Sequence, residues 1–165
     1  MQASPLEQFA TLLISHGVEF IVIGGQAETL FGSPRITYDV DLCYRRTGGN
    51  LDRLAVVLGE LRVTLRGAPP DLPFQIDARS LALGSNFTFC TVYGDLDLLG
   101  YVEPLGGYEE LLAHAVDVSV YGLQLKVIGL DDLIKIKQHI GRSKDRESLL
   151  QLLAIKRVRG EEGQS

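Results

Sequence analysis

The chain has 165 residues, of which 45% are apolar and 22% are charged, and its net charge is −5. This is typical of one globular domain with a hydrophobic core, and the acidic balance argues against a general nucleic-acid coat. No apolar run approaches the ~20 residues that cross a membrane, and the N-terminus lacks the basic start of a secretory signal. We therefore expect a cytoplasmic protein with no membrane partner.

The first elements are a helix and a strand. Ser4 can cap the helix, Pro5 fits its first turn, Glu7 completes a capping box, and Gly17 ends it. The segment 19–25, EFIVIGG, is apolar and β-branched almost throughout, which favours a central strand.

A second strand and a third helix follow. A short helix, QAETLFG, ends at Gly32, and the segment 37–44, TYDVDLCY, is typical of a strand. After a TGGN loop, Asn50 is a candidate cap for a helix that carries leucines and valines at helical spacing up to Leu61.

The second half contains further strands and ends in helices. The predicted strands are FQIDAR (74–79), NFTFCTVYG (86–94) and DLDLLGYV (95–102). A short helix, a hairpin that turns at Gly122, and two helices separated by Gly141 complete the chain, the helices being 130–140 and 143–158. This order predicts an α/β or α+β fold in which helices flank one mixed sheet, with a single domain over residues 1–158 and a disordered tail at 159–165.

Two carboxylates stand in the second predicted strand. Asp39 and Asp41 are two residues apart, so they face the same side, roughly 7 Å apart at the backbone for a rise of ~3.4 Å per residue. Carboxylates in an apolar strand are costly unless something binds them, and hard divalent ions such as Mg²⁺ prefer carboxylate oxygens and substrate phosphates. The pair therefore predicts a metal site, whereas a lone aspartate would be read as solvated.

A third carboxylate would complete a two-ion site for phosphoryl transfer. Asp97 is our choice because Leu96, Leu98 and Leu99 surround it in a predicted strand. Asp95, on the same face, and Asp77 remain alternatives, as does a solvated Asp97.

The glycines and the residues before Asp39 suggest phosphate contacts. Gly24 and Gly25 join a strand to a helix, where backbone can approach a phosphate and free N–H groups favour anions. Arg35 could reach a phosphate, and Thr37 lies just before the carboxylates. The alternatives are a tight strand-to-helix turn and an arginine that limits repulsion around Asp39.

Lys137 lies inside the apolar stripe of its predicted helix, so its ammonium group needs an anion. Asp145 is on the same side of the next helix as its apolar stripe and could pair with Lys137. Alternatively, Lys137 meets a nucleotide phosphate or a strand aspartate, and the two interpretations are compatible. Arg142 and Lys144, between the helices, are either a basic loop or further phosphate contacts.

These motifs resemble the nucleotidyltransferase superfamily. The stretch IGGQAETLFGSPRITYDVDL resembles its strand, Gly-Gly, short helix and Asp-x-Asp, and the distal DLIKIKQHIGRSKD is similar to the AbiEii-type branch. That branch includes toxins of abortive-infection systems and relatives of antibiotic nucleotidyltransferases. The resemblance spans about residues 20–153.

The resemblance implies a small mixed sheet flanked by helices and transfer of a nucleoside monophosphate from a nucleoside triphosphate to an acceptor hydroxyl. It implies that Asp39 and Asp41 bind Mg²⁺ or Mn²⁺, that Asp97 binds metal or acts as a base, and that Gly24 and Gly25 contact the triphosphate. The distal motif falls on nucleotide-contact candidates, which are Lys137, Arg142, Lys144 and Asp145.

The resemblance leaves the acceptor open between RNA, a protein and a small molecule. Many AbiEii toxins hold it with a further C-terminal helical domain, whereas this sequence stops soon after the distal motif. A partner protein or a second copy of the chain could supply that surface. The alternative function is an inactive nucleotide-binding or partner module on the same fold.

Overall fold

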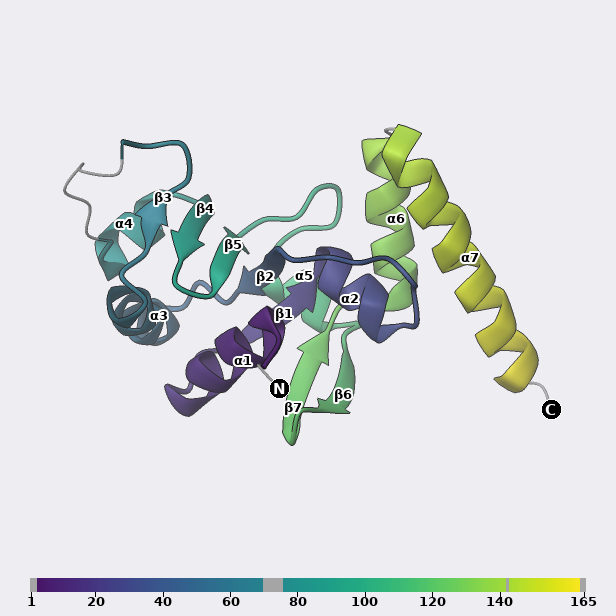
Figure 1. The fold of residues 1–165 in the computed structure, drawn as a ribbon, viewed down its shortest axis with the longest axis horizontal. Coiled ribbons are helices and arrows are strands. Elements are labelled where there is room, and N and C mark those ends of the chain that lie inside the picture. Colours follow the sequence, from purple (N-terminus) through teal and green to yellow (C-terminus); the bar gives the residue numbers. More distant parts are fainter. Residues whose placement is uncertain (1–2, 70–75, 142, 164–165) are drawn as a thin grey trace.

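The computed structural model describes residues 3–69, 76–141 and 143–163. One mixed sheet has the strand order β3-β4-β5-β2-β1-β7-β6 (Figure 1). The strands are β1 (Phe20–Ile23), β2 (Val40–Tyr44), β3 (Thr64–Leu65), β4 (Asn86–Thr91), β5 (Gly94–Leu99), β6 (Val116–Val120) and β7 (Leu123–Val127). The helices are α1 (Pro5–Ser15), α2 (Gly24–Leu30), α3 (Gly48–Glu60), α4 (Ala78–Leu83), α5 (Tyr108–Leu112), α6 (Leu130–Ile140) and α7 (Ser143–Gly163). The predicted single α/β unit with a mixed sheet flanked by helices is confirmed.

The centre of the sheet determines where the polar residues meet. Strand β1 is buried along its whole length, pairs antiparallel with β2 and runs parallel to β7. Strand β2 pairs in parallel with β5, and in this register Asp41 lies opposite Asp97. Two aspartates that are 56 positions apart in the chain therefore become neighbours.

Several local predictions are confirmed. The Ser4 side chain caps α1 by accepting the N–H of Glu7 at 3.2 Å. The hairpin between β6 and β7 turns at Gly122, whose φ is 71°. Gly141 ends α6 in the left-handed conformation, with a φ of 64°, which lets α7 return beside α6 (Figure 1).

Three local predictions are corrected by the structure. Asn50 lies inside α3, which already begins at Gly48; its buried side chain instead bonds the backbone of Glu19 and Arg45. The described part of the expected strand 74–79 is not a strand, because Asp77 caps α4. Helix α7 continues to Gly163, beyond the end that we expected for this helix at Val158.

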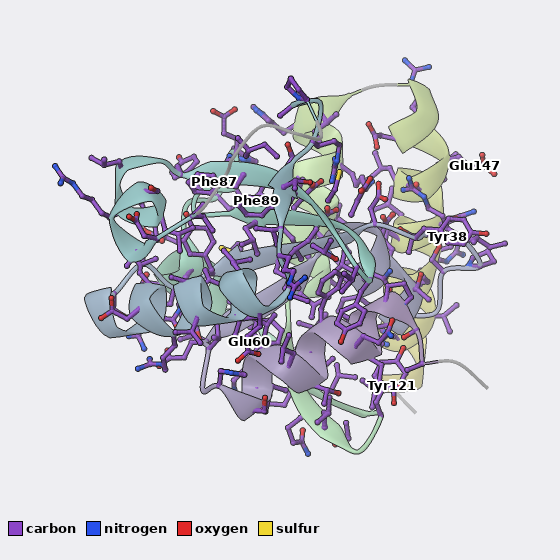
Figure 2. The ribbon with its side chains drawn as sticks, turned by 60° about the vertical axis from the view of Figure 1, so that its left-hand side comes forward. Tyr38, Glu60, Phe87, Phe89, Tyr121 and Glu147 are labelled. Atoms are coloured by element: carbon purple, nitrogen blue, oxygen red, sulfur yellow. The ribbon has the colours of Figure 1, made fainter. Side chains whose placement is uncertain are left out.

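Aromatic side chains contribute to the core. The rings of Phe87 and Phe89 stack at 5.8 Å between centroids (Figure 2), and Tyr44 is fully buried and donates its hydroxyl to the Ser85 carbonyl at 2.6 Å. Cys43 and Cys90 are free thiols. Among the described residues, none of the helices has the length and apolar character needed to cross a membrane.

Candidate active site

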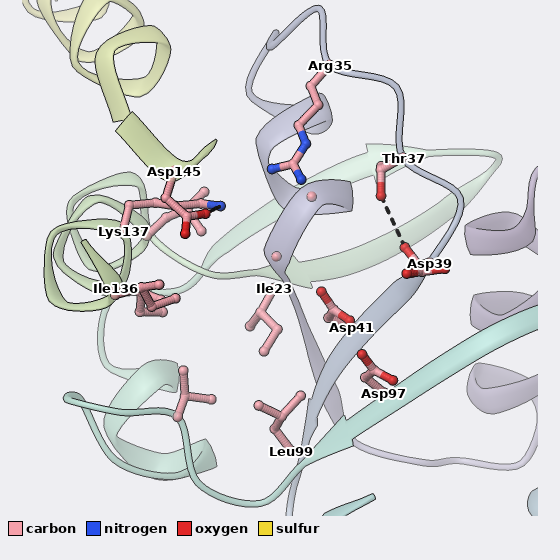
Figure 3. A pocket seen from close by; sticks show the side chains of 15 residues that line it. Ile23, Arg35, Thr37, Asp39, Asp41, Asp97, Leu99, Ile136, Lys137 and Asp145 are labelled. Carbon is pink, nitrogen blue, oxygen red and sulfur yellow. Dashed lines mark hydrogen bonds and ion pairs between the residues drawn. The ribbon is translucent and has the colours of Figure 1, made fainter. Parts of the chain in front are cut away.

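A cavity of about 320 Å³ lies where the ends of β1, β2 and β5 face α6 and the start of α7 (Figure 3). Most of the sequence-predicted site residues line it: Gly24, Gly25, Arg35, Thr37, Asp39, Asp41, Asp97, Lys137 and Asp145. The remaining wall is apolar and comes from Ile23, Leu99, Val102, Leu133, Ile136 and Ile140. We call the three aspartates Asp39, Asp41 and Asp97 the acidic half, and the cations Arg35 and Lys137 with their partners the basic half.

The acidic half is built by strand pairing. Asp41 and Asp97 occupy paired positions on β2 and β5, and Asp39 lies just before β2 and lines the same cavity. Figure 3 shows the Asp41 and Asp97 carboxylates side by side, with Asp39 in the segment that leads into β2. Sequence alternation predicted the pair Asp39–Asp41, and the parallel register of β2 and β5 adds Asp97 to this pair.

Crowding changes the protonation of Asp41. Burial is the main cause that raises its pKa from 3.8 to about 7, followed by a hydrogen bond and charge repulsion with Asp97 and repulsion from Asp39. The proton that enters belongs to the Asp41–Asp97 pair rather than to one residue. Without a bound cation, the acidic half therefore contains carboxylates whose full ionisation is unfavourable.

Arg66 is a member of this cluster that the sequence did not reveal. It follows the two-residue strand β3, and its guanidinium contacts Asp97 Oδ1 at 2.7 Å and Asp95 Oδ2 at 3.4 Å. Its charge lowers the pKa of Asp41, against burial and the interactions with Asp97 and Asp39, which raise it. No periodicity marks Arg66, because the antiparallel pairing of β3, β4 and β5 alone carries it to the aspartates.

The two glycines are required by their neighbours. Gly24 has a φ of 67°, and a Cβ added there would lie 2.2 Å from Asp41 Oδ2. A Cβ at Gly25 would lie 2.8 Å from the Thr37 hydroxyl. The turn is therefore glycine because the side chains of Asp41 and Thr37 pack directly against its backbone.

Gln26 supports the segment that leads into the acidic half, another role that sequence reasoning missed. Its buried side chain donates to the carbonyl of Asp39 at 3.2 Å and to that of Thr37 at 3.5 Å. The Thr37 hydroxyl also donates to the Asp39 carbonyl, at 3.4 Å (Figure 3). These bonds connect the start of β2 to α2, the helix that follows the glycine turn.

The basic half is a buried ion network. Lys137 Nζ lies 3.2 Å from Asp145 Oδ1 and 3.4 Å from Glu28 Oε2, and Arg35 Nη1 contacts the same Glu28 oxygen at 3.3 Å. The side chain of Glu28 is 1% exposed and that of Lys137 is 10% exposed. The predicted Lys137–Asp145 pair is thus present, and both residues also line the cavity.

Glu28 is the anion at the centre of this network, and we did not select it from the sequence. The signal was the inward Lys137, which demanded an anion, together with a glutamate among the apolar residues of α2. Among the described residues, its second oxygen, Oε1, is buried and accepts no hydrogen bond. Arg35 also donates to the Ser148 hydroxyl at 3.2 Å, so the network joins α2, α6 and α7.

The remaining candidates from the sequence are Asp77, Asp95, Arg142 and Lys144. Asp77 is outside the cavity lining; its side chain accepts the N–H and hydroxyl of Ser80 at 2.8 Å. Asp95 pairs with Arg66 and is likewise absent from the lining. Arg142 lies outside the described residues, and for Lys144 only the backbone, in the first turn of α7, is described.

Solved structures of nucleotidyltransferases share this architecture. The lincomycin-bound lincosamide antibiotic adenylyltransferase LnuA has a TM-score of 0.60 at 14% identity, over 92% of this chain and 96% of its own. The antibiotic-resistance factor ANT(2'')-Ia has a TM-score of 0.60 at 12% identity, over 97% and 90%. A nucleotidyltransferase described as putative, from Thermotoga maritima, has a TM-score of 0.55 at 14% identity, over 93% and 96%. This chain has the nucleotidyltransferase fold.

The likeness is one of structure. No protein-family model matches the sequence, and no sequence among curated proteins matches it. At these identities the comparison establishes the nucleotidyltransferase fold, while the site must be judged from its own geometry.

The donor set of the acidic half suits a hard divalent cation. Among the described residues, no three carboxylate, imidazole or thiol side chains stand close enough in this conformation to hold a metal ion. Nevertheless, Asp39, Asp41 and Asp97 line one cavity and offer only oxygen donors, and burial, together with interactions with the other two carboxylates, raises the pKa of Asp41 to about 7. A Mg²⁺ or Mn²⁺ ion would offset this negative charge, so the chemistry of the oxygen donors fits such an ion.

Proposed function

We propose that the protein is a metal-dependent nucleotidyltransferase that moves a nucleoside monophosphate from a nucleoside triphosphate to an acceptor hydroxyl. The observation that carries the proposal is the pairing of Asp41 with Asp97 across β2 and β5, beside Asp39 and packed against the Gly24 turn. Repelling carboxylates that line a cavity are expensive to maintain in a structural role. We propose that the protein works in the cytoplasm.

The reaction would exchange one phosphate ester bond for another. The acceptor oxygen forms a bond to the α-phosphorus, and the bond from that phosphorus to the oxygen that bridges to the β-phosphate breaks. Pyrophosphate leaves, and the proton of the acceptor hydroxyl passes to a carboxylate. Catalysis of this kind depends on positioning and charge neutralisation rather than on covalent chemistry of the protein.

The residues of the chain have distinct roles in this proposal. Asp97 would accept the proton or bind metal, and Asp39 and Asp41 would bind the divalent ion. Gly24 and Gly25 allow the phosphates to approach the backbone, and Thr37 and the half-exposed Arg35 face them. Lys137 and Asp145 line the far side of the cavity, where Lys137 keeps a positive charge near the phosphates. A bound Mg²⁺ or Mn²⁺ would supply charge neutralisation at the triphosphate.

Two observations suggest different acceptors. Two structural neighbours, LnuA and ANT(2'')-Ia, are an antibiotic adenylyltransferase and an antibiotic-resistance factor, which suggests a small-molecule acceptor. The sequence resemblance to the AbiEii-type branch instead suggests a toxin of a toxin–antitoxin system that modifies RNA or protein. In either case we propose that a partner protein or a second copy of the chain can contribute to the acceptor surface.

The reaction is tested by determining which phosphate of the nucleoside triphosphate is transferred to an acceptor. The protein is incubated with Mg²⁺ and each nucleoside triphosphate labelled at the α- or the γ-phosphate, together with pools of cell RNA, protein or hydroxylated antibiotics. We expect the α-label, and not the γ-label, to enter one acceptor pool, and Asp41→Asn to abolish the transfer. Asp117→Asn is the matched control, because Asp117 is exposed on β6 and pairs with Lys126.

Two results would contradict the proposal. One is the absence of α-label in every pool with all four triphosphates, and the other is equal transfer by Asp41→Asn and the wild type.

A second candidate function is a nucleotide-binding module without turnover. The contact of 2.7 Å between Arg66 and Asp97 favours it, because a base or metal ligand that is already paired with arginine is less available. Calorimetric titration with ATP or CTP and Mg²⁺ would then show binding with no pyrophosphate released. A lack of affinity for any triphosphate would eliminate this candidate.

A further inference from the structure

Arg66 is anchored beside the acidic half by several contacts. Its backbone N–H donates to the Thr88 carbonyl of β4 at 3.0 Å, which fixes where the side chain starts. From there the guanidinium passes β4, with a long contact of 3.4 Å to the Phe89 carbonyl, and ends on Asp95 and Asp97 of β5. The shortest of these contacts, 2.7 Å, is the one to Asp97.

This contact places a permanent positive charge where a metal ion would need a ligand. Arginine stays protonated at every pH at which the protein folds, so the charge cannot be removed by titration. Asp97 also lies opposite Asp41 in the pairing of β2 with β5. Arg66 therefore interacts electrostatically with Asp39 and Asp41 as well. A divalent cation entering the acidic half meets both a ligand that is already engaged and a like charge.

The guanidinium is nevertheless accessible to solvent and to a ligand in the cavity. Its side chain is 34% exposed, and its contact to the protein backbone at Phe89 is long. A nucleoside triphosphate brings several negative charges into the cavity, which would attract both the guanidinium and a divalent ion.

We propose that Arg66 is a positioning residue that competes with the divalent cation for Asp97, so that the ion binds well only together with the nucleotide. In the ligand-free protein the guanidinium neutralises Asp97; with metal and triphosphate present it leaves Asp97 to the ion. This inference rests on the proposed function, and it adds that tight binding of the cation depends on the bound nucleotide.

Metal affinity, rather than activity, tests the competition. Mn²⁺ binding is measured by electron paramagnetic resonance and calorimetry, with and without α,β-methylene ATP, on the wild type, Arg66→Gln, Arg66→Lys and Arg46→Gln. Arg46 is the matched control for the loss of one positive charge, because its guanidinium bonds the carbonyls of Ala82 and Gly84. Thermal unfolding verifies that each variant is folded.

We expect Arg66→Gln to bind Mn²⁺ roughly tenfold more tightly than the wild type without nucleotide, because a like charge is removed from the site. The effect of the nucleotide analogue on Mn²⁺ binding should shrink in this variant. Arg66→Lys, which retains the charge, and Arg46→Gln should stay close to the wild type. Unchanged or weaker Mn²⁺ binding by Arg66→Gln would overturn the inference.

A crystal structure of the wild type with Mn²⁺ and α,β-methylene ATP tests the same inference without any variant. The expected result is an ion on Asp97 and a guanidinium that no longer contacts it; an intact Arg66–Asp97 pair beside the bound ion would overturn the inference alone. If neither Mn²⁺ nor the nucleotide binds the wild type, the proposed function fails and this inference fails with it.

Discussion

The acidic and basic halves of the cavity treat charge in opposite ways. In the acidic half, three aspartates lie on or beside neighbouring strands, and burial of Asp41, together with its interactions with Asp97 and Asp39, raises its pKa to about 7. In the basic half, Lys137 and Arg35 are each within 3.4 Å of Glu28, and Lys137 also contacts Asp145. Like charges therefore meet at one end of the cavity and opposite charges at the other.

The difference separates stability from function. Opposite charges that are buried together connect three helices, so removing one of them leaves its partner uncompensated and should destabilise the fold. Carboxylates that crowd without a cation should instead lower stability, and removing one should stabilise the ligand-free protein. Mutations in the two halves are thus expected to have opposite signs.

The largest expected effect is on the buried lysine. Lys137→Met leaves Glu28 and Asp145 without their shared cation and should lower the free energy of unfolding by about 3–5 kcal/mol. Denaturant unfolding measures this change. Lys135→Met is the control on the same helix. Lys135 is 58% exposed and lies as far as 4.0 Å from its partner Asp132, so this variant should lose at most about 1 kcal/mol of unfolding free energy. Equal losses in the two variants would contradict our account of the basic half.

A double-mutant cycle sharpens the role of Glu28. Glu28→Gln preserves the shape of the side chain but removes its charge, and its coupling energy with Lys137→Met should be about 1–3 kcal/mol. The exposed pair Asp117–Lys126 serves as the reference cycle, with an expected coupling of about 0–1 kcal/mol. If the two cycles gave the same coupling, burial would not strengthen the pair, and the proposed importance of Glu28 would be wrong.

The acidic half should respond in the opposite direction. Asp41→Asn relieves repulsion with Asp39 and Asp97, so we expect the melting temperature of the ligand-free protein to rise by about 2–4 °C. Added Mg²⁺ and ATP should raise the melting temperature of the wild type but not that of the variant. Differential scanning calorimetry measures both, with Asp117→Asn as the control. A lower melting temperature in Asp41→Asn would show that the carboxylate stabilises the fold.

The smallest expected effect is a change with pH. Because folding raises the pKa of Asp41 from 3.8 to about 7, the folded state binds a proton that the unfolded state releases. The stability that this proton contributes is present at pH 4 and is lost as the pH rises through about 7. The advantage of Asp41→Asn over the wild type should therefore be greater at pH 8.5 than at pH 5. A difference in melting temperature that does not vary with pH would contradict the raised pKa.

Local patterns predicted the elements that carry the site better than they predicted its composition. Strand alternation placed Asp39 and Asp41 on one face, and helical spacing turned Lys137 inward toward Asp145; the structure places all four around one cavity. The predicted cap at Asn50 was wrong, because that side chain reaches the backbone of Glu19 and Arg45 instead of its own helix. A cap is chosen by local geometry, whereas this side chain is fixed by packing between elements.

The sequence by itself determined the periodic features: the apolar strand that stops at Gly24 and Gly25, the alternation of Asp39 and Asp41, and the inward lysine of α6. These depend on spacings of two and of three to four residues, which the backbone geometry imposes wherever a strand or helix forms. Only the tertiary structure decided that Asp97 rather than Asp77 joins Asp41, that Arg66 contacts Asp97, and that Glu28 pairs with Lys137. The reason is that these contacts depend on the register between strands and on the packing of α2 against α6, which residues distant in the chain fix together.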